Sequence, residues 1–474
     1  MYYLSRYPRL TFAMLMLAPP LLLLVLLALH VIPAFPFTKL ARVIPAPLPN
    51  VYRVPFQLSS DPYTGGVGQH QTEVEPDSYS YGSTIVAAFQ VGRFSDGGSV
   101  NIGWATSIDG GETWIHGFLP GITDVVGGPF TRTSDPSVSY DAAHKTWLIS
   151  SLGIQGGGNN FASVAILVNL STDGGKTWSK PIRVINGGST YFDKDWIVCD
   201  NTTTSPFYGH CYVEWDDDTK GGLILMSTST NGGHSWSAAK TTADKAKGTG
   251  GQPLVQPNGT VIVPIGGYDS SSILSFTSTN GGASWSKAVI AARITGSVLP
   301  TAEIDASGKV YLVWVDCDFE TTCNTQDDHL QHDLEMSTST DGIHWSPVQF
   351  IPADPLASGI DHLVPGLAVD KNTAGSHAHL ALAFYYHPVN CDSQCKFYLG
   401  FVSSRDGGTH WTPKITPAGP MDISWLPLGH NKVGDYISVS FCSCNAYPVF
   451  SIAIPPTNGH LNEAMFTITG GLMV

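Results

Sequence analysis

Polar side chains recur along this 474-residue chain at similar intervals, each near the start of a run of β-forming residues. If those runs lie side by side around an axis, the mostly acidic side chains meet in a ring. Such a ring is stable only when its members are protonated, paired or bound to a cation. Each residue therefore either caps its own strand or belongs to a shared ligand or Ca2+ site. The residues are Glu75, Asp135, Asp195, Gln252, Glu303, His362 and Asp435.

Two acidic stretches, WDDDTKGG (215–222) and DCDFETTCNTQDDHLQHDLE (316–335), extend this pattern. Carboxylate and carbonyl oxygens are the ligands that Ca2+ requires. No EF-hand spacing is present, and acidic loops are usually just solvated. Ca2+ is therefore the one cofactor considered, and no metal ligands are assigned.

The elements that position these groups are indicated by an eight-residue repeat. In each copy Asp or Asn and the glycines favour a tight turn, and the closing Trp buries a large area. The repeat is therefore structural and not catalytic. The copies are SIDGGETW (107–114), STDGGKTW (171–178), STNGGHSW (229–236), STNGGASW (278–285), the shorter STDGIHW (339–345) and SRDGGTHW (404–411).

The spacing of the copies fits one four-stranded antiparallel blade per repeat of an all-β propeller. A further set of strands follows the last copy, in DYISVSFC, AYPVFSIA and NEAMFTITG, and lacks its outer strand. We expect NVYRVPFQL (50–58) to supply that strand, because strands from both ends of the chain would then close the ring. Seven blades account for every segment; six blades with a decorated C-terminus are the alternative.

The repeat SxDGGxxW resembles the Asp box, or BNR repeat, of the sialidase superfamily over about residues 70–470. The phrases SDPSVSYD, DKDWIVCD and GDYISVS are also similar to exported bacterial sialidase-like propellers. In that family the box joins the third and fourth strands of a blade. The resemblance therefore implies that all boxes lie on one face and that ligands bind at the channel mouth on the other.

The resemblance also implies a set of catalytic groups: three arginines that hold a carboxylate, a Tyr nucleophile activated by a Glu, and an Asp acid/base. Arg93, Arg132 and Arg293 are the candidate arginines. The candidate catalytic residues are Tyr436, Glu303 and Asp135, and Asp195, Gln252, His362 and Asp435 are further ligand-binding candidates. YRVP (52–55) nearly matches the family's first arginine motif, but no second or third motif is matched. We therefore expect a propeller that binds a glycan or protein without a complete sialidase site. The alternative is an exo-sialidase-type hydrolase acting on acidic glycans.

The N-terminal segment predicts a membrane anchor. No charged residue occurs between Arg9 and Lys39, and residues 10–32 are almost wholly apolar and long enough to span a bilayer. Arg6 and Arg9 favour a cytoplasmic N-terminus. The predicted order is a cytoplasmic segment (1–9), a signal anchor (10–32), a Pro-rich linker (33–49) and an extracellular propeller (50–474); a cleaved signal peptide and secretion are the alternative.

Eight cysteines and the overall charge complete the expectations. We expect disulfides in Cys199/Cys211, Cys317/Cys323 and Cys391/Cys395, whereas a bridge across Cys442 and Cys444 would be strained. Zinc is the rival interpretation, but neither CxxC nor paired His spacing occurs. A net charge of −14 argues against nucleic-acid binding. We expect a monomer.

Overall fold

Short antiparallel strands make up nearly all regular structure in the computed structural model. It describes residues 53–474 apart from 66–67, 158–161, 296–298, 321–322, 324–330, 390, 392–394 and 428–432. The only helical segments among these residues are three-residue 3-10 turns. They are η1 (Asp124–Val126), η3 (Asp218–Lys220), η4 (Gly375–His377) and η6 (Ile423–Trp425). The prediction of an all-β fold is confirmed for the described residues.

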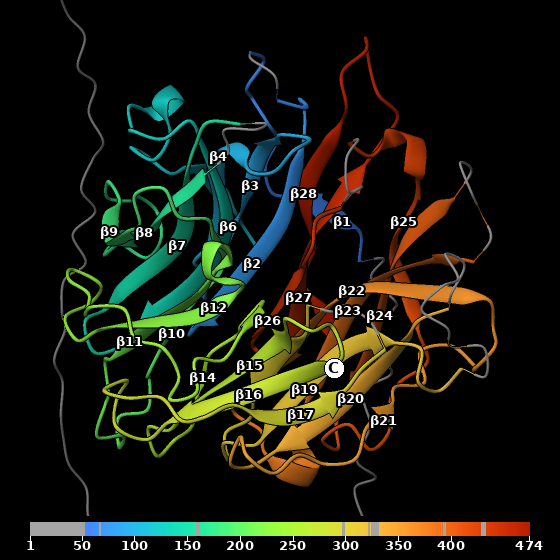
Figure 1. The fold of residues 1–474 in the computed structure, drawn as a ribbon. Helices are drawn as coiled ribbons and strands as arrows, with labels where there is room; N and C mark the ends of the chain where they lie inside the picture. Colours follow the sequence, from blue (N-terminus) through green and yellow to red (C-terminus); the bar gives the residue numbers. More distant parts are fainter. Residues whose placement is uncertain are drawn as a thin grey trace, which may run out of the picture. The chain divides into compact units, whose positions relative to one another are not determined.

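Strands that follow one another in the sequence also pair with one another (Figure 1). The first group is β2 (Glu73–Tyr81), β3 (Thr84–Arg93), β4 (Ser99–Ser107) and β5 (Ile115–Phe118). The second is β6 (Arg132–Asp141), β7 (Thr146–Gln155), β8 (Ala162–Ser171) and β9 (Ile182–Asn186). One residue pair, Ser99 with Thr133, joins these two groups into a single sheet. The third group is β10 (Phe192–Cys199), β11 (Cys211–Asp217) and β12 (Leu223–Ser229). Its edge is continued only by isolated bridges such as that between Met226 and Lys240.

The remaining groups repeat the pattern. The fourth is β13 (Gly248–Thr249), β14 (Leu254–Val255), β15 (Val261–Gly267), β16 (Ser272–Ser278) and β17 (Val289–Arg293). The fifth is β18 (Thr301–Ile304), β19 (Val310–Asp316), β20 (Asp333–Ser339) and β21 (Gln349–Phe350). The sixth is β22 (Ile360–Val369), β23 (Leu380–Pro388), β24 (Lys396–Ser404) and β25 (Ile415–Asp422). The seventh is β26 (Ser438–Cys442), β27 (Asn445–Ala453) and β28 (Glu463–Ile468), with β29 (Leu472–Met473) paired to β27.

The two ends of the described chain meet in the seventh group. Strand β1 (Pro55–Gln57) pairs antiparallel with β28, with Phe56 opposite Thr467. Figure 1 shows this blue N-terminal strand beside the red C-terminal strands. The predicted pairing of residues 50–58 with the last strand set is confirmed for these three residues.

The apolar core lies between neighbouring groups. Leu152 of β7 and Trp215 of β11 belong to one buried cluster, and Ile262 of β15 and Leu312 of β19 belong to another. The first strands also contact each other in order, from β2 through β6, β10, β14, β18 and β22 to β26, which in turn contacts β2. Burial between adjacent groups therefore positions the first strands side by side.

The eight-residue repeats form hydrogen-bonded turns, as predicted. In the first copy the Ser107 hydroxyl accepts a hydrogen bond from Gly111 N (2.8 Å), and Asp109 Oδ1 accepts one from Thr113 N (2.9 Å). Gly111 has a φ of 88°, and a Cβ there would lie 2.2 Å from the Tyr447 ring. The turn therefore requires glycine on steric grounds, which gives the repeat a structural role.

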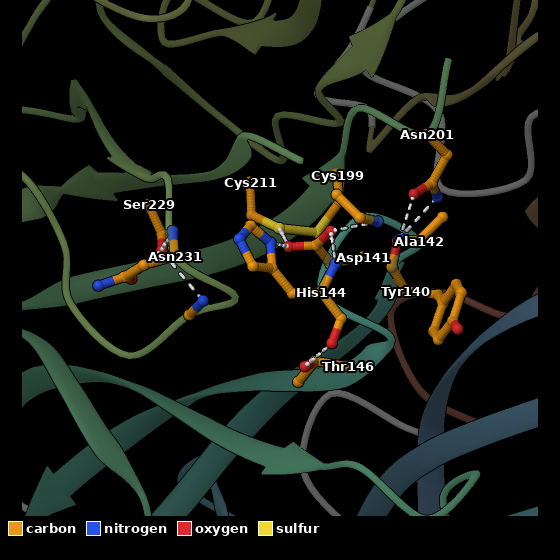
Figure 2. Close-up of a disulfide and its surroundings, with 12 residues drawn as sticks. Tyr140, Asp141, Ala142, His144, Thr146, Cys199, Asn201, Cys211, Ser229 and Asn231 are labelled. Atoms are coloured by element: carbon orange, nitrogen blue, oxygen red, sulfur yellow. Dashed lines mark hydrogen bonds and ion pairs between the residues drawn. A yellow bond between two sulfur atoms is a disulfide. The ribbon is translucent and has the colours of Figure 1, made fainter. Parts of the chain in front are cut away.

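Three disulfides join the cysteine pairs expected from the sequence: Cys199–Cys211, Cys317–Cys323 and Cys391–Cys395. Figure 2 shows the first, which links residues opposite each other on β10 and β11, beside Asp141 and His144. Cys442 is a buried free thiol and Cys444 an exposed one. The doubtful fourth bridge is thus absent.

The location predicted from the N-terminal segment is contradicted and needs correction. In the part of the chain that the structure describes, no helix is long and apolar enough to cross a membrane. Residues 1–9, 10–32 and 33–49, which carried that prediction, lie outside the described residues.

Candidate functional site

Four first strands contain a β-bulge at the same place. The register shifts between Val74 and Asp77 in β2, Ser134 and Ser137 in β6, Asp193 and Trp196 in β10, and Leu363 and Gly366 in β22. In each bulge one non-glycine residue has a left-handed backbone: Glu75 (φ 55°), Asp135 (51°), Lys194 (38°) and Val364 (52°). Such residues cost about 1–3 kcal/mol each and gather at functional sites. The bulges therefore place two carboxyls and one lysine at matching positions of three neighbouring strands.

Lys194 is buried against two aromatic rings. Its Nζ lies 3.5 Å from the centroid of the Tyr436 ring and 4.0 Å from the centroid of the Trp196 ring. The two rings pack edge to face with centroids 5.5 Å apart. Lys194 Nζ has no hydrogen-bond partner among the described residues, so cation–π contacts hold the ammonium group. The Tyr436 hydroxyl donates to the carbonyl oxygen of Pro136 (3.3 Å).

Three of the carboxyls near this lysine hold protons more tightly than usual. Burial raises the pKa of Glu75 well above its ordinary range, and Asp435 and Asp135 raise it further. Burial also raises the pKa of Asp77 to about 6 and that of Asp193 to about 8. The cluster therefore carries less negative charge at neutral pH than its composition suggests.

The same burial acts on the lysine and the tyrosine. It lowers the pKa of Lys194, although Asp135 and Asp195 oppose this effect. Burial raises the pKa of Tyr436 well above its usual value, and the nearby Asp135 adds to that shift. Tyr436 is therefore a neutral phenol, and it could act as a nucleophile only beside a base that accepts its proton.

The predicted catalytic residues are divided between two places. Asp135 and Tyr436 belong to the cluster around Lys194. Glu303 lies on β18 and forms an ion pair with Lys371, away from the bulges. The structure thus brings together two of the three residues.

The three predicted arginines have different surroundings. Arg132 donates to Asp96 (2.6 Å) and to the carbonyl oxygen of Gly97 (2.9 Å), and its guanidinium lies 4.0 Å from the centroid of the Phe94 ring. Arg93 donates to the Gln69 side chain (3.2 Å). Arg293 is exposed at the end of β17, the outermost strand of its sheet.

The other predicted ligand-binding residues also separate. Asp195 is fully buried in the cluster, and the exposed Asp435 acts electrostatically on Glu75. Gln252 accepts a hydrogen bond from Ala302 N (2.6 Å) at the wall of a cavity between the first strands. His362 instead bonds the His332 carbonyl oxygen (2.7 Å) and Asp354 (3.1 Å), so its ring is held by residues just before β20 and just after β21.

A cavity of about 580 Å³ lies between the first strands, and all seven groups contribute residues to its wall. Its wall extends from Asp77 and Trp196 to Gly82 and Cys442 at the ends of the first strands. Gly82 lies near the turn of the first eight-residue repeat. The ligand site predicted from the sequence was at the opposite end of these strands, where each of them begins. We name this space the channel cavity. Trp196 lines it and also contacts Lys194, so the Lys194 cluster closes one end.

The polar groups of the channel cavity come from several strands. Glu303 and Lys371 form an ion pair there, and Asn201 donates to the Tyr79 hydroxyl (3.3 Å). Sequence reasoning missed Lys194, Trp196, Tyr79 and Lys371. Pro76, Pro136 and Pro365 directly follow three of the four bulge residues, and proline inside a strand is a signal for a bulge. No such signal marks Lys194.

Comparison with known proteins identifies the repeat. Residues 207–416 match the model of the BNR repeat-like domain. No curated protein matches the chain. An ulvan lyase, described as a member of a new polysaccharide lyase family, aligns with a TM-score of 0.51 at 11% identity, over 88% of this chain and 96% of the lyase.

Two sialidases align less closely. A Hadza microbial sialidase aligns with a TM-score of 0.46 at 13% identity, over 84% of this chain and 66% of that protein. The NanB sialidase from Streptococcus pneumoniae gives 0.45 at 16% identity, over 90% of this chain and 71% of that protein. The repeat match shows a BNR repeat-like domain over residues 207–416, and the described strand groups before and after it have the same antiparallel pattern.

Proposed function

We propose that this protein is a seven-bladed, sialidase-like propeller that binds a glycan in its channel cavity and lacks a complete sialidase site. The contacts from each first strand to the next, and from β26 back to β2, support a closed ring. The pairing of β1 with β28 supports closure by the two ends of the chain.

One observation carries the binding proposal: the first strands of all seven groups line a single cavity whose wall combines aromatic rings with polar groups. Its volume of about 580 Å³ lies within the range of small-ligand pockets, about 300–1,000 Å³. The partly exposed rings of Trp196 and Tyr79 offer flat apolar faces. Asn201, Glu303 and Lys371 offer the donors and acceptors that sugar hydroxyls require.

Similarity to carbohydrate-active proteins supports a glycan as the ligand class. The ulvan lyase with the same fold acts on a polysaccharide according to its description. The engaged Arg132 and the exposed Arg293 argue against a carboxylate held by three arginines. The hydrolase alternative rests on one specific observation, the presence of Asp135 and Tyr436 in one buried cluster with Glu75.

Two measurements on the full chain separate these functions. An array of neutral and acidic glycans tests binding, and a fluorogenic sialoside tests turnover. We expect saturable binding to one glycan class and no sialoside turnover. Turnover that is lost in Tyr436→Phe would replace this proposal with the hydrolase, and the absence of binding to any glycan would reject it.

A further inference from the structure

Glu335 of β20 is an acidic residue at a position where the fold does not require a charged side chain. It lies four residues before Ser339, the serine that opens its repeat, and its side chain is fully buried. Neither of its carboxylate oxygens has a hydrogen-bond partner among the described residues. The other five repeats place an apolar residue at this position: Gly103, Leu167, Leu225, Leu274 and Gly400. Burial of an unpartnered carboxyl is costly, so Glu335 needs another explanation than packing.

Two further carboxylates face Glu335. Asp316 is the last residue of β19 and Asp318 lies two residues beyond it, and one oxygen of each lies within 4.8 Å of a Glu335 oxygen and of the other. Asp316 is buried and accepts hydrogen bonds from Cys317 N and Thr295 N, both at 2.8 Å. The exposed Asp318 accepts one from the Thr295 hydroxyl (2.9 Å). These bonds fix the two aspartates in place and leave three acidic groups converging.

The third strand group provides an internal comparison. Its strand β11 reads CYVEWDD, and β19 reads VYLVWVD, so Asp217 corresponds to Asp316. Asp217 pairs with Lys220 (2.6 Å), and Leu225 takes the place of Glu335. In the described chain no Lys or Arg pairs with Asp316, Asp318 or Glu335. One repeat therefore neutralises its aspartate with a lysine, whereas the other adds a second buried acid.

We propose that Asp316, Asp318 and Glu335 bind a Ca2+ ion. Ca2+ takes six to eight oxygen ligands at about 2.3–2.6 Å, so two ligand oxygens on opposite sides lie up to about 5 Å apart. The spacing within 4.8 Å fits this geometry. Three carboxylates supply three to six oxygens, and water can supply the rest. Zn2+ prefers nitrogen and sulfur ligands, and the nearby Cys317 and Cys323 are joined in a disulfide.

The ion would tie the end of β19 to β20, close to the connection from the fourth group to the fifth. Thr295, which follows β17, donates to both aspartates, and Glu335 lies on β20 opposite Trp314 of β19. Binding of Ca2+ to the folded state alone raises stability in proportion to the logarithm of its concentration. Ca2+ is thus expected to stabilise this edge of the fold without taking part in glycan binding.

The test uses the full chain, freed of metal with EGTA and titrated with CaCl2 by calorimetry and thermal unfolding. Tb3+ luminescence excited through tryptophan provides a second readout, because Trp314 lies opposite Glu335. We expect one site per chain and a Tm that rises with Ca2+. Glu335→Gln and Asp316→Asn should each weaken Ca2+ binding about tenfold or more, since each removes one charged ligand.

Glu335→Leu keeps the test valid if other variants fold poorly, because it introduces the leucine that the third repeat has at the equivalent position, Leu225. In EGTA it should unfold at a higher Tm than the unmodified chain, and Ca2+ should not change that Tm. Asp269→Asn, in an exposed turn on another group, should leave the Ca2+ response unchanged. The proposal is overturned if millimolar Ca2+ changes neither heat nor Tm, or if Glu335→Leu binds Ca2+ as tightly as the unmodified chain.

Discussion

The Nζ of Lys194 lies 3.5 Å from the centroid of the Tyr436 ring, and this contact joins two segments more than half the chain apart. Lys194 is a buried cation among several carboxyls, including Glu75, Asp77 and Asp135. Because these carboxyls are buried, the lysine offsets their negative charge in place of the surrounding water.

Lys194→Met should destabilise the protein by about 3 kcal/mol, because it removes a buried cation that offsets the charge of the surrounding carboxyls. Urea unfolding at pH 7 measures this loss. Lys176→Met, at an exposed position of the second repeat, is the matched control and should stay within about 0.5 kcal/mol. Equal stability of the two variants would show that Lys194 does not stabilise the cluster.

The buried Glu73 predicts a specific pH dependence. Burial raises its pKa to about 8, so the folded state keeps its proton up to that pH. The unfolded chain loses the proton near about 4.3, so the folded state binds more protons between these values. The contribution of Glu73 to stability therefore falls as pH rises from about 4 to 8.

Glu73→Gln retains an acceptor for Met465 N but carries no charge at any pH. We expect it to match the unmodified chain near pH 4 and to exceed it by a few kcal/mol near pH 9. Urea unfolding at both values measures the difference between the two proteins. A difference that is independent of pH would contradict the assignment.

The Asp-box turns should affect stability and leave binding unchanged. Asp173 accepts hydrogen bonds from Lys176 N (3.0 Å), Thr177 N (3.0 Å) and the Thr177 hydroxyl (2.7 Å). Asp173→Ala should cost about 1–3 kcal/mol. Asp173→Asn should cost less, because Asn231 and Asn280 occupy this position in two other repeats. Loss of glycan affinity at full stability would give the turns a role in binding.

The cysteine pairing predicts a simple thiol count. Three disulfides use six of the eight cysteines, which leaves Cys442 and Cys444. Titration with a chromogenic disulfide reagent should detect one fast thiol in the folded protein and two after denaturation. Cys444→Ser should remove the fast phase, because Cys444 is exposed and Cys442 is buried. Four thiols in the denatured chain would mean that one bridge is missing.

Much of the fold could be predicted from the sequence because its signals are local. Each turn needs glycine and a side-chain acceptor within a few residues, and alternate strand residues face a core. The pairing of β1 with β28 followed from counting strands, since the last set lacked an outer member. The third group has three strands instead of the predicted four, because only isolated bridges form at the edge where the fourth strand was expected.

The site could be predicted only in part, because it depends on contacts between distant residues. Asp135 and Tyr436 meet only once their strand groups are packed, and no local pattern shows that Lys194 lies between the two rings. Arg293 belongs to β17, the outermost strand of its sheet. The β-forming residues around it predict a strand but do not show whether that strand is inner or outer. Glu335, in contrast, could have been recognised by aligning the repeats at their serines.

Calorimetric titration of the best-binding glycan into the full chain tests the central proposal most directly. Glu303→Gln, in the wall of the channel cavity, should weaken binding about tenfold with little change in Tm. Glu112→Gln, an exposed residue of the first repeat, should bind as the unmodified chain does. Equal affinity of all three proteins, together with an unchanged affinity of Trp196→Phe, would place the glycan outside the channel cavity and contradict the account.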